Sequence, residues 1–435
     1  MGERFMHLFL GFAIVAPFVC ALVVAVGLVL ARHWLSESVV AATIRRGLTV
    51  SVLASLGAIA TYLGAFGAPI RGEIEYGNWL AVGDYAIPLT LLVDPGALVF
   101  SLLASVLTLL VARFSRTYLH KEPGFDRFFF LIGIFAAGTQ LIAFAGALDL
   151  FFAGWELIGI SSALFIGFFH ERDEPVRSSV RAFATYRLCD MGLLIAIVTI
   201  HELLGSTKLS ALDSAGSLPA LESSAIAALL LLAAMGKSAQ LPFSGWLPRA
   251  MEGPTPSSAL FYGAVSIHAG LYLLLRVSAV IEVAPYVAAF GVFVGVATAL
   301  YASAIARIHT DAKGALAHAT LAQIGLILAE ISLGLTTLAL IHLSCHAMLR
   351  VYQYLRTPNM IHDAHTAGHG HHHSGPGWLT KLAPKTSERV YGAALHRWRL
   401  DERVDAAVAP ALGLARWLDR VDHRVRSSLS LDARS

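Results

Sequence analysis

The stretch that decides the fold is residues 229–264, which read LLLLAAMGKSAQLPFSGWLPRAMEGPTPSSALFYGA. It places Lys237 inside an apolar run of membrane-spanning character, with Pro242 five residues later. A cation at bilayer depth costs at least about 2.5 kcal/mol, so it is rarely there without a function. Proline removes a backbone donor and breaks the helix, and a broken helix with an ionisable side chain is typical of ion transport. The stretch therefore predicts a membrane helix broken at Pro242 and centred on Lys237.

The composition extends this prediction to the whole chain. Of 435 residues, 56% are hydrophobic and 14% are charged, and the mean hydropathy is +0.67, which excludes a soluble domain of this size. We predict an all-α, polytopic membrane bundle, because apolar runs long enough to cross a bilayer recur along the chain. The eleven predicted spans are 8–31, 47–67, 88–112, 128–146, 148–168, 182–203, 224–246, 257–279, 284–306, 314–331 and 333–354.

Basic residues predict how these spans are oriented. Lys and Arg gather in alternate connections, after spans one, three, five, seven and nine, whereas residues 68–87 lean acidic. The positive-inside rule then places the N-terminus outside and the C-terminus in the cytoplasm, in a bacterial cytoplasmic membrane.

The composition changes after residue 355, and it divides the chain into five regions. Residues 362–377 form a His/Gly-rich run, which we interpret as a passive linker or, alternatively, as a metal-buffering or proton-collecting segment. The tail that follows has an apolar stripe from Val404 to Val425 and predicts an amphipathic cytoplasmic helix that docks on the membrane or on a partner. The predicted regions are 1–127, 128–279 (a first repeat of five spans), 280–356 (an incomplete second repeat), 357–385 (linker) and 386–435 (tail).

Several segments resemble the antiporter-like subunits of respiratory complex I and of multisubunit cation/proton antiporters. They occur in family order and cover most of residues 90–355. The matching segments are LLVDPGALVF (91–100), FFAGWELIGISSALFIGFF (151–169), RAFATYRLCDMGLL (181–194), MGKSAQLPFSGWLPRAMEGPTPSSAL (235–260), RIHTDAKGALAHATLAQIGLI (307–327) and LIHLSCHAMLRVYQYL (340–355). The resemblance implies a proton-conducting membrane subunit. It also implies a second broken helix after span eleven, but no apolar run of spanning length follows residue 355.

The residues of the central motif are most similar to those of one branch of this family. Phe243-Ser244-Gly245 and Tyr262 stand where complex I subunits usually carry other residues. This variant resembles DabB, the membrane subunit of the DAB inorganic-carbon accumulation complexes. That likeness implies a large, peripheral, zinc-binding DabA-like partner on the cytoplasmic face, with the zinc in the partner and no cofactor in this chain.

Glu156 and Lys237 are the first two candidates for the ion path. The resemblance pairs such a glutamate with such a lysine, and a moving proton can switch a pair of this kind. The alternative is a static ion pair that orients helices.

Further candidates lie in spans ten and eleven. Lys313 either continues a proton relay toward His318 or is an interfacial lysine that reaches the headgroups. His342 and His346 share one helix face with Arg350, and imidazoles suit proton relay because they titrate near neutral pH. Arg350 does not deprotonate usefully, so it is an electrostatic gate or an anchor.

The remaining candidates have structural alternatives. His268 is a relay member or a hydrogen-bonded structural histidine, and Glu330 is a candidate exit carboxylate. We interpret Arg187 and Asp190 as a structural ion pair near the inner end of span six. Asp94, before Pro95, is expected to be a helix N-cap or an interface feature. We predict no metal site in this chain, because His342 and His346 lack a third ligand.

These residues support three hypotheses. In the first, H⁺ or Na⁺ flows through Glu156, Lys237, Lys313 and the histidines of span eleven, and gates a partner that converts CO₂ to bicarbonate. In the second, the chain is an ion-translocating subunit of a respiratory or antiporter complex. In the third, it is a non-conducting anchor. No phosphate loop, catalytic triad or CxxC pair occurs, so we expect no enzyme activity and no nucleic-acid partner, and membrane lipids as the surroundings.

Overall fold

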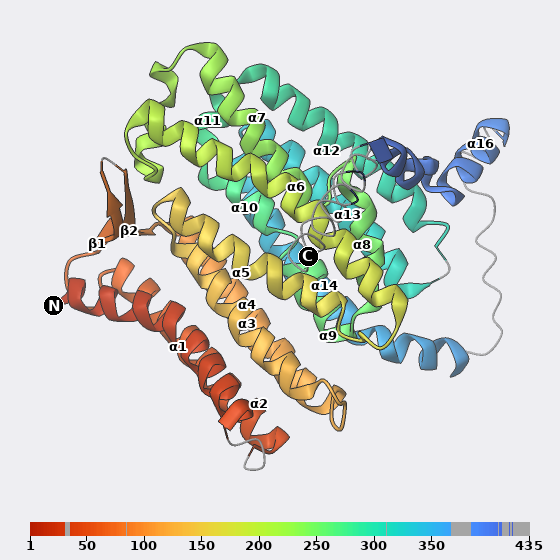
Figure 1. The fold of residues 1–435 in the computed structure, drawn as a ribbon, viewed down its shortest axis with the longest axis horizontal. Helices are drawn as coiled ribbons and strands as arrows, with labels where there is room; N and C mark the ends of the chain where they lie inside the picture. The colour runs from red at the N-terminus through yellow and green to blue at the C-terminus, as the bar shows by residue number, and fades with distance from the viewer. Residues whose placement is uncertain are drawn as a thin grey trace, which may run out of the picture. The chain divides into compact units, whose positions relative to one another are not determined.

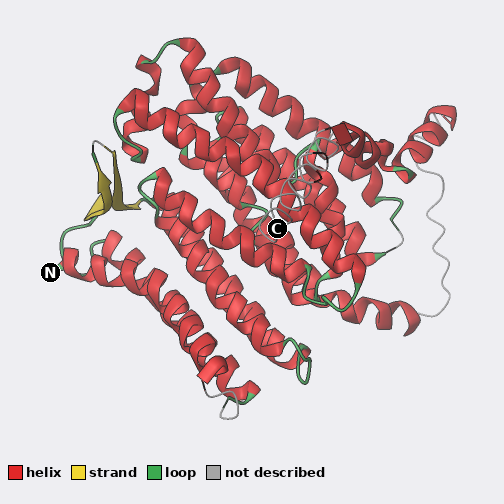
Figure 2. Cartoon of the chain, in the orientation of Figure 1, coloured by secondary structure: helices red, strands yellow, loops and turns green. Residues whose placement is uncertain are grey.

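The computed structural model describes residues 1–30, 35–83, 85–309, 311–366, 384–407, 409–410, 417 and 420. The chain divides into two compact units, Met1–His372 and His373–Ser435. The first unit is a helical bundle with one β-hairpin (Figures 1 and 2). Ten of its helices are long and apolar enough to cross a membrane, so the predicted polytopic helical fold is confirmed.

The first two helices, α1 (Gly2–Leu30) and α2 (Glu37–Tyr62), pack closely against each other. A Cβ at Gly47 would stand 3.0 Å from the carbonyl oxygen of Ala16, and the Ser51 hydroxyl donates to the carbonyl of Ala13 at 2.8 Å. The start predicted for this second span is wrong by ten residues, since the helix already begins at Glu37. The first turns of this helix contain polar residues, which lower the hydropathy there, while the other faces of the helix are apolar.

An antiparallel hairpin, β1 (Gly72–Val82) and β2 (Tyr85–Val93), follows α2 and pairs from Gly72↔Val93 to Val82↔Tyr85. The predicted span 88–112 is therefore wrong at its start, because residues up to Val93 belong to a strand. Pro95 opens α3 (Pro95–Tyr118), and Asp94 caps it by accepting a hydrogen bond from Ala97 N at 2.7 Å. The expected N-cap at Asp94 is confirmed, and its carboxylate also pairs with Arg276 at 2.7 Å.

The centre of the bundle contains α4 (Phe125–Phe144), α5 (Leu148–Ile166), α6 (Asp173–Leu204) and α7 (Ala220–Lys237), with a 3₁₀ segment, η2 (Leu209–Ser217), before α7. Glycines let α4 and α5 approach closely: a Cβ on Gly154 would stand 2.7 Å from the carbonyl oxygen of Gly138. Such small-residue contacts are the usual way membrane helices pack.

Two helices of the bundle are discontinuous. After α7 come short pieces: η3 (Phe243–Gly245), α8 (Trp246–Arg249), η4 (Ala250–Glu252) and α9 (Thr255–Ser257). The next predicted span, 257–279, consists of a π-helix, η5 (Ser258–Ala264), a break, α10 (Ala269–Arg276) and α11 (Ser278–Glu282). Together these pieces cover most of the predicted span, since Thr255–Arg276 is among the helices long and apolar enough to cross a membrane.

The last helices of the unit are α12 (Pro285–Ala306), α13 (Ala312–Ser332) and α14 (Thr336–Thr366). A Cβ on either Gly295 or Gly325 would stand 2.5 Å from the other glycine's carbonyl oxygen, so α12 and α13 touch through glycine. The eleventh predicted span starts three residues before α14 and otherwise lies within it; α14 is not among the ten helices of membrane-spanning length and hydropathy in the described residues. Its ionisable side chains lower its hydropathy.

The second unit contains α16 (Pro384–Leu395), η6 (Arg397–Arg399) and helical residues 400–407. The helix α14 includes the first ten residues of the predicted linker, 357–366. Residues 367–383 and most of the predicted apolar stripe beyond 407 lie outside the described residues.

Candidate ion-translocation site

Lys237 is the last residue of α7 and is 1% exposed. Its Nζ donates to the carbonyl oxygen of Trp155 at 3.1 Å, and lies 4.6 Å and 5.0 Å from the ring centroids of Trp155 and Tyr186. Two aromatic faces and a carbonyl dipole thus surround the ammonium, contacts that replace part of its hydration. Sequence reasoning missed Trp155 and Tyr186, although both belong to segments that carry the family resemblance.

The break that follows Lys237 is built from local backbone geometry. The peptide Leu241–Pro242 is cis, and Ala239 has a φ of +52°, in the left-handed region that side chains other than glycine rarely adopt. Trp246 Nε1 donates to the carbonyl oxygen of Gly236 at 3.0 Å, so a helix-end acceptor is satisfied. The break is therefore present, and the helix ends five residues before Pro242.

Two carboxylates and one guanidinium complete the surroundings of Lys237. Arg187 pairs directly with Glu156, and its Nη2 lies 3.7 Å from Asp190 Oδ2. Asp190 Oδ1 accepts a hydrogen bond from Trp155 Nε1 at 2.5 Å. Both carboxylates act electrostatically on Lys237, and Asp190 does so more strongly. We call Glu156, Arg187, Asp190 and Lys237 the four-charge cluster; with all four groups ionised, its net charge is zero.

This arrangement changes two predictions. The direct ion-pair partner of Glu156 is Arg187, while Lys237 bonds to a backbone carbonyl. Placing Arg187 and Asp190 near the inner end of a span is wrong, because α6 starts at Asp173, nine residues before the predicted start, and both residues lie in its middle.

The cluster is incompletely hydrogen-bonded within the described residues. Glu156 Oε1, Arg187 Nε and Asp190 Oδ2 are buried and have no hydrogen-bond partner there. A buried polar atom in this state costs free energy, so the cluster is an expensive feature of the bundle.

A second polar network joins α14 to the break between η5 and α10. Arg350 Nε donates to His346 Nε2 at 3.0 Å, and His346 Nδ1 lies 3.0 Å from His268 Nε2. His268 Nδ1 contacts the carbonyl oxygen of Ala264. Since Arg350 only donates, neutral His346 carries its proton on Nδ1, and neutral His268 does the same. We call Arg350, His346 and His268 the histidine chain.

The π-helix η5 gives His268 this position. Residue 268 follows the last turn of η5 and precedes α10, in the interruption of the helix. Gly263 allows the close approach to α14, since a Cβ there would stand 2.7 Å from the Tyr354 ring. A π-helical turn inside a helix is frequent at functional sites, and no residue pattern in the sequence predicts it here.

His342 continues the network one helical turn earlier on α14. Its Nδ1 lies 2.8 Å from Glu330 Oε1, and its Nε2 lies 3.0 Å from Gln323 Oε1. The rings of His342 and His346 are 6.4 Å apart between centroids. The structure thus brings together the predicted residues Glu330, His342 and His346. It adds Gln323, whose sequence signal is an amide side chain in the same helix as Glu330.

Lys313 and His318 lie together at the start of α13. Lys313 is near Asp311 and Glu252, which both act on its charge. His318 Nδ1 lies 2.9 Å from the carbonyl oxygen of Gly314. No contact within the described residues joins Lys313 to either Lys237 or His342, so its predicted place in the relay stays a prediction.

A single hydrogen bond connects the two breaks. The Ser238 hydroxyl donates to the carbonyl of Ile267 at 2.7 Å. Ser238 follows Lys237, and Ile267 precedes His268, so the two helix breaks lie side by side.

Metal ligands do not gather at this site. Within the parts of the chain that the structure describes, no group of three or more His, Cys, Asp or Glu side chains is suited to hold a metal ion. The histidines between 362 and 373 lie outside the residues whose side chains are described.

Comparison with known proteins gives the family. Residues 145–376 match the model of the NADH:quinone oxidoreductase/Mrp antiporter transmembrane region, and residues 79–129 match that of the complex I chain 5 N-terminus. The chain belongs to this family.

Relatives of known name agree with this assignment. The chain is 31% identical to NAD(P)H-quinone oxidoreductase chain 5 of Picosynechococcus over 80% of its own length and 53% of that protein. It is 33% identical to chloroplastic subunit 5 of Adiantum capillus-veneris over 66% of its length and 40% of that protein. The chain therefore spans about half the length of the curated relatives it matches.

Among solved structures, the Mrp complex of a Dietzia species matches with a TM-score of 0.69 and 27% identity, over 80% of this chain and 37% of that one. The archaeal membrane-bound sulfane sulfur reductase has the same TM-score at 18% identity and shows the fold alone, over 80% of this chain and 70% of that one. These relatives fit the second of the three hypotheses better than the carbon-accumulation hypothesis.

Proposed function

We propose that this chain is an ion-translocating, antiporter-like membrane subunit of a complex I- or Mrp-type assembly. The observation that carries the proposal is Lys237: it is fully buried at a helix break, lies beside two carboxylates, and precedes Ser238, which bonds to the residue before His268. A static scaffold has no need of two charged groups of each sign at membrane depth.

The four-charge cluster gives a first step. A proton that arrives on Glu156 neutralises the partner of Arg187, and the guanidinium, already 3.7 Å from Asp190, then turns toward that carboxylate. Asp190, now paired, stabilises the ammonium of Lys237 less, and Lys237 releases its proton toward the break. The reverse sequence reloads the lysine.

The histidine chain gives a second step. A proton that reaches His346 Nε2 releases the Nδ1 proton to His268 Nε2. Arg350 occupies Nε2, so it must withdraw first and acts as a gate, with Gln353 as the alternative partner that it already contacts at 2.6 Å. This step makes Arg350 an electrostatic gate and not a carrier.

The test uses the whole complex, with this chain and its partner subunits, in inverted membrane vesicles. Internal acidification is followed with a fluorescent dye, in sodium and in choline buffers, to identify the ion. We expect Lys237→Ala to abolish translocation. Lys208→Ala is the matched control, because Lys208 is a half-buried lysine that pairs with Glu75 of the hairpin, away from the four-charge cluster. Wild-type translocation by Lys237→Ala would refute the proposal and favour the non-conducting anchor.

A second candidate function keeps the same ion path and changes the partner. In it, the chain couples ion flow to a DabA-like peripheral subunit that holds zinc and hydrates CO₂, while this chain holds no cofactor. The resemblance at Phe243-Ser244-Gly245 and Tyr262 favours this candidate. The Tyr262 hydroxyl is buried and donates to the Ser162 carbonyl at 2.9 Å. Co-expression with the product of the adjacent gene should then rescue growth in air of a strain lacking carbonic anhydrase. Failure to rescue at good expression rejects it.

A further inference from the structure

Glu330 of α13 and His342 of α14 form a polar pair that neither proposed transport step uses. Glu330 Oε1 lies 2.8 Å from His342 Nδ1, and the two side chains are 20% and 23% exposed. Glu330 is close to the end of α13, which is Ser332, and α14 begins at Thr336. The pair therefore lies between the turn that joins these helices and the histidine chain.

Gln323 determines the state of the other imidazole nitrogen. Its Oε1 lies 3.0 Å from His342 Nε2, and an amide oxygen only accepts, so Nε2 carries a proton. A neutral imidazole has one N–H, so with that proton on Nε2 the Nδ1 lone pair would face the carboxylate of Glu330. Two acceptors at 2.8 Å repel each other, and the contact is favourable only with a second proton between Nδ1 and Oε1.

The burial of Glu330 points the same way. Its Oε2 is buried and has no hydrogen-bond partner within the described residues. A buried carboxylate is costly unless a cation pairs with it, and His342 is the basic group in contact with Glu330. Imidazole is a stronger base than carboxylate, so the second proton belongs on Nδ1. The pair then consists of an imidazolium and a carboxylate and has no net charge.

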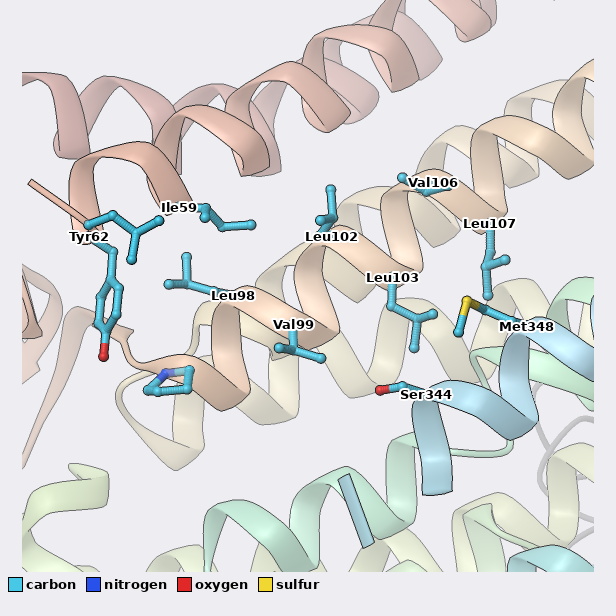
Figure 3. A pocket seen from close by; sticks show the side chains of 12 residues that line it. Ile59, Tyr62, Leu98, Val99, Leu102, Leu103, Val106, Leu107, Ser344 and Met348 are labelled. Atoms are coloured by element: carbon cyan, nitrogen blue, oxygen red, sulfur yellow. The ribbon is translucent and has the colours of Figure 1, made fainter. Parts of the chain in front are cut away.

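The opposite side of α14 adds no charge to this pair. Ser344 follows His342 by two positions, about 200° around the helix, and lines an apolar groove beside α3 (Figure 3). No charged side chain lines that groove. Along α14 the next imidazole is His346, whose ring centroid is 6.4 Å from that of His342, and Arg350 follows one turn later.

We propose that Glu330 and His342 store one mobile proton between Oε1 and Nδ1, at the α13–α14 end of the histidine chain. Gln323 is the positioning residue, because it keeps Nε2 protonated and leaves Nδ1 as the nitrogen that exchanges its proton. Loading adds one proton to the pair and changes its net charge from one negative charge to none, and unloading reverses this.

The position of the pair suits a station on the route. Partial exposure lets a proton arrive from the α13–α14 turn or leave toward it. Transfer between His342 and His346 requires a ring rotation or one bridging water, because both nitrogens of His346 already face His268 and Arg350. The part of the pair in transport rests on the proposed function, whereas the stored proton is measured without any ion flow.

The experiment determines the protonation of His342 by solid-state nitrogen NMR, on the full chain labelled at histidine and reconstituted in lipid vesicles at pH 7. The signals of His342 are those that disappear in His342→Gln. Glu330→Gln keeps the shape of the side chain and removes its charge, and Glu330→Asp keeps a carboxylate. Glu282→Gln is the matched control, because Glu282 is exposed at the end of α11.

We expect both ring nitrogens of His342 to be protonated in the wild-type protein and in Glu282→Gln, and only Nε2 in Glu330→Gln. Glu330→Asp should regain the second proton. A single protonated nitrogen in the wild-type protein, or two in Glu330→Gln, would overturn the stored proton. The wild-type spectrum decides this even where a variant does not fold.

The role in transport is measured in vesicles that contain the whole complex. Glu330→Gln should translocate at least about tenfold more slowly than the wild type, and Glu282→Gln should match the wild type. Wild-type transport by Glu330→Gln while Lys237→Ala is inactive would remove the pair from the ion route and leave the proposed function standing. Wild-type transport by both variants would refute the proposed function as well.

Discussion

Asp190→Asn tests the proposed switch at its centre. Asparagine keeps the size of the side chain and an oxygen that accepts the hydrogen bond from Trp155 Nε1, so the change removes little besides the charge. At 3.7 Å and an effective dielectric constant of about 20, the attraction between Asp190 and Arg187 is about 4.5 kcal/mol. The carboxylate is 4% exposed but Arg187 is 39% exposed, so we take about half, near 2 kcal/mol.

The consequence is a cluster of net charge +1, in which Arg187 loses this attraction to residue 190, so the arrangement from which Lys237 releases its proton is less populated. A free energy of about 2 kcal/mol corresponds to roughly 30-fold, and we expect translocation in inverted vesicles to fall by that factor. Glu202→Gln, at an exposed position late in the same helix, should transport normally and serves as the control. If Asp190→Asn keeps more than half of the wild-type rate while Glu156→Gln is inactive, Asp190 is not part of the switch.

Three further outcomes are expected. His346→Asn should lower translocation at least tenfold by interrupting the histidine chain, with a melting temperature near wild type; unchanged transport would exclude that chain. Gly159→Ala places a Cβ 3.0 Å from the ammonium of the four-charge cluster and should slow transport several-fold, whereas Gly11→Ala, with open space around it, should not. A hydrogen bond to the acidic partner on β1 raises the pKa of Lys208. That tie is therefore present below the ordinary lysine pKa of about 10.4 and is lost only as pH rises through the raised value. The hydrogen-exchange rate of hairpin amides, corrected for the intrinsic rate, should therefore be the same at pH 7 as at pH 9 in the wild-type protein. In Lys208→Ala it should be faster at both pH values.

Composition and hydropathy predict most of this fold from sequence, because a bilayer requires long apolar helices. The spans at 148–168 and 284–306 agree with α5 and α12 to within two residues at each end. The predicted span boundaries are wrong where something other than hydropathy decides where a helix begins or ends. The hairpin strand up to Val93 is as apolar as the helix after it, and α6 extends into charged residues that side-chain length carries to the surface.

By itself, the sequence determined which ionisable groups lie inside the bundle: Glu156, Lys237 and the histidines of α14 stand between apolar residues whatever the packing. Only the tertiary structure decided their partners. Glu156 meets Arg187, Lys237 lies between two aromatic rings, and His268 joins His346 across 78 residues of chain. The physical reason is that hydropathy is summed along one helix, whereas an ion pair depends on how neighbouring helices rotate and where their backbones break.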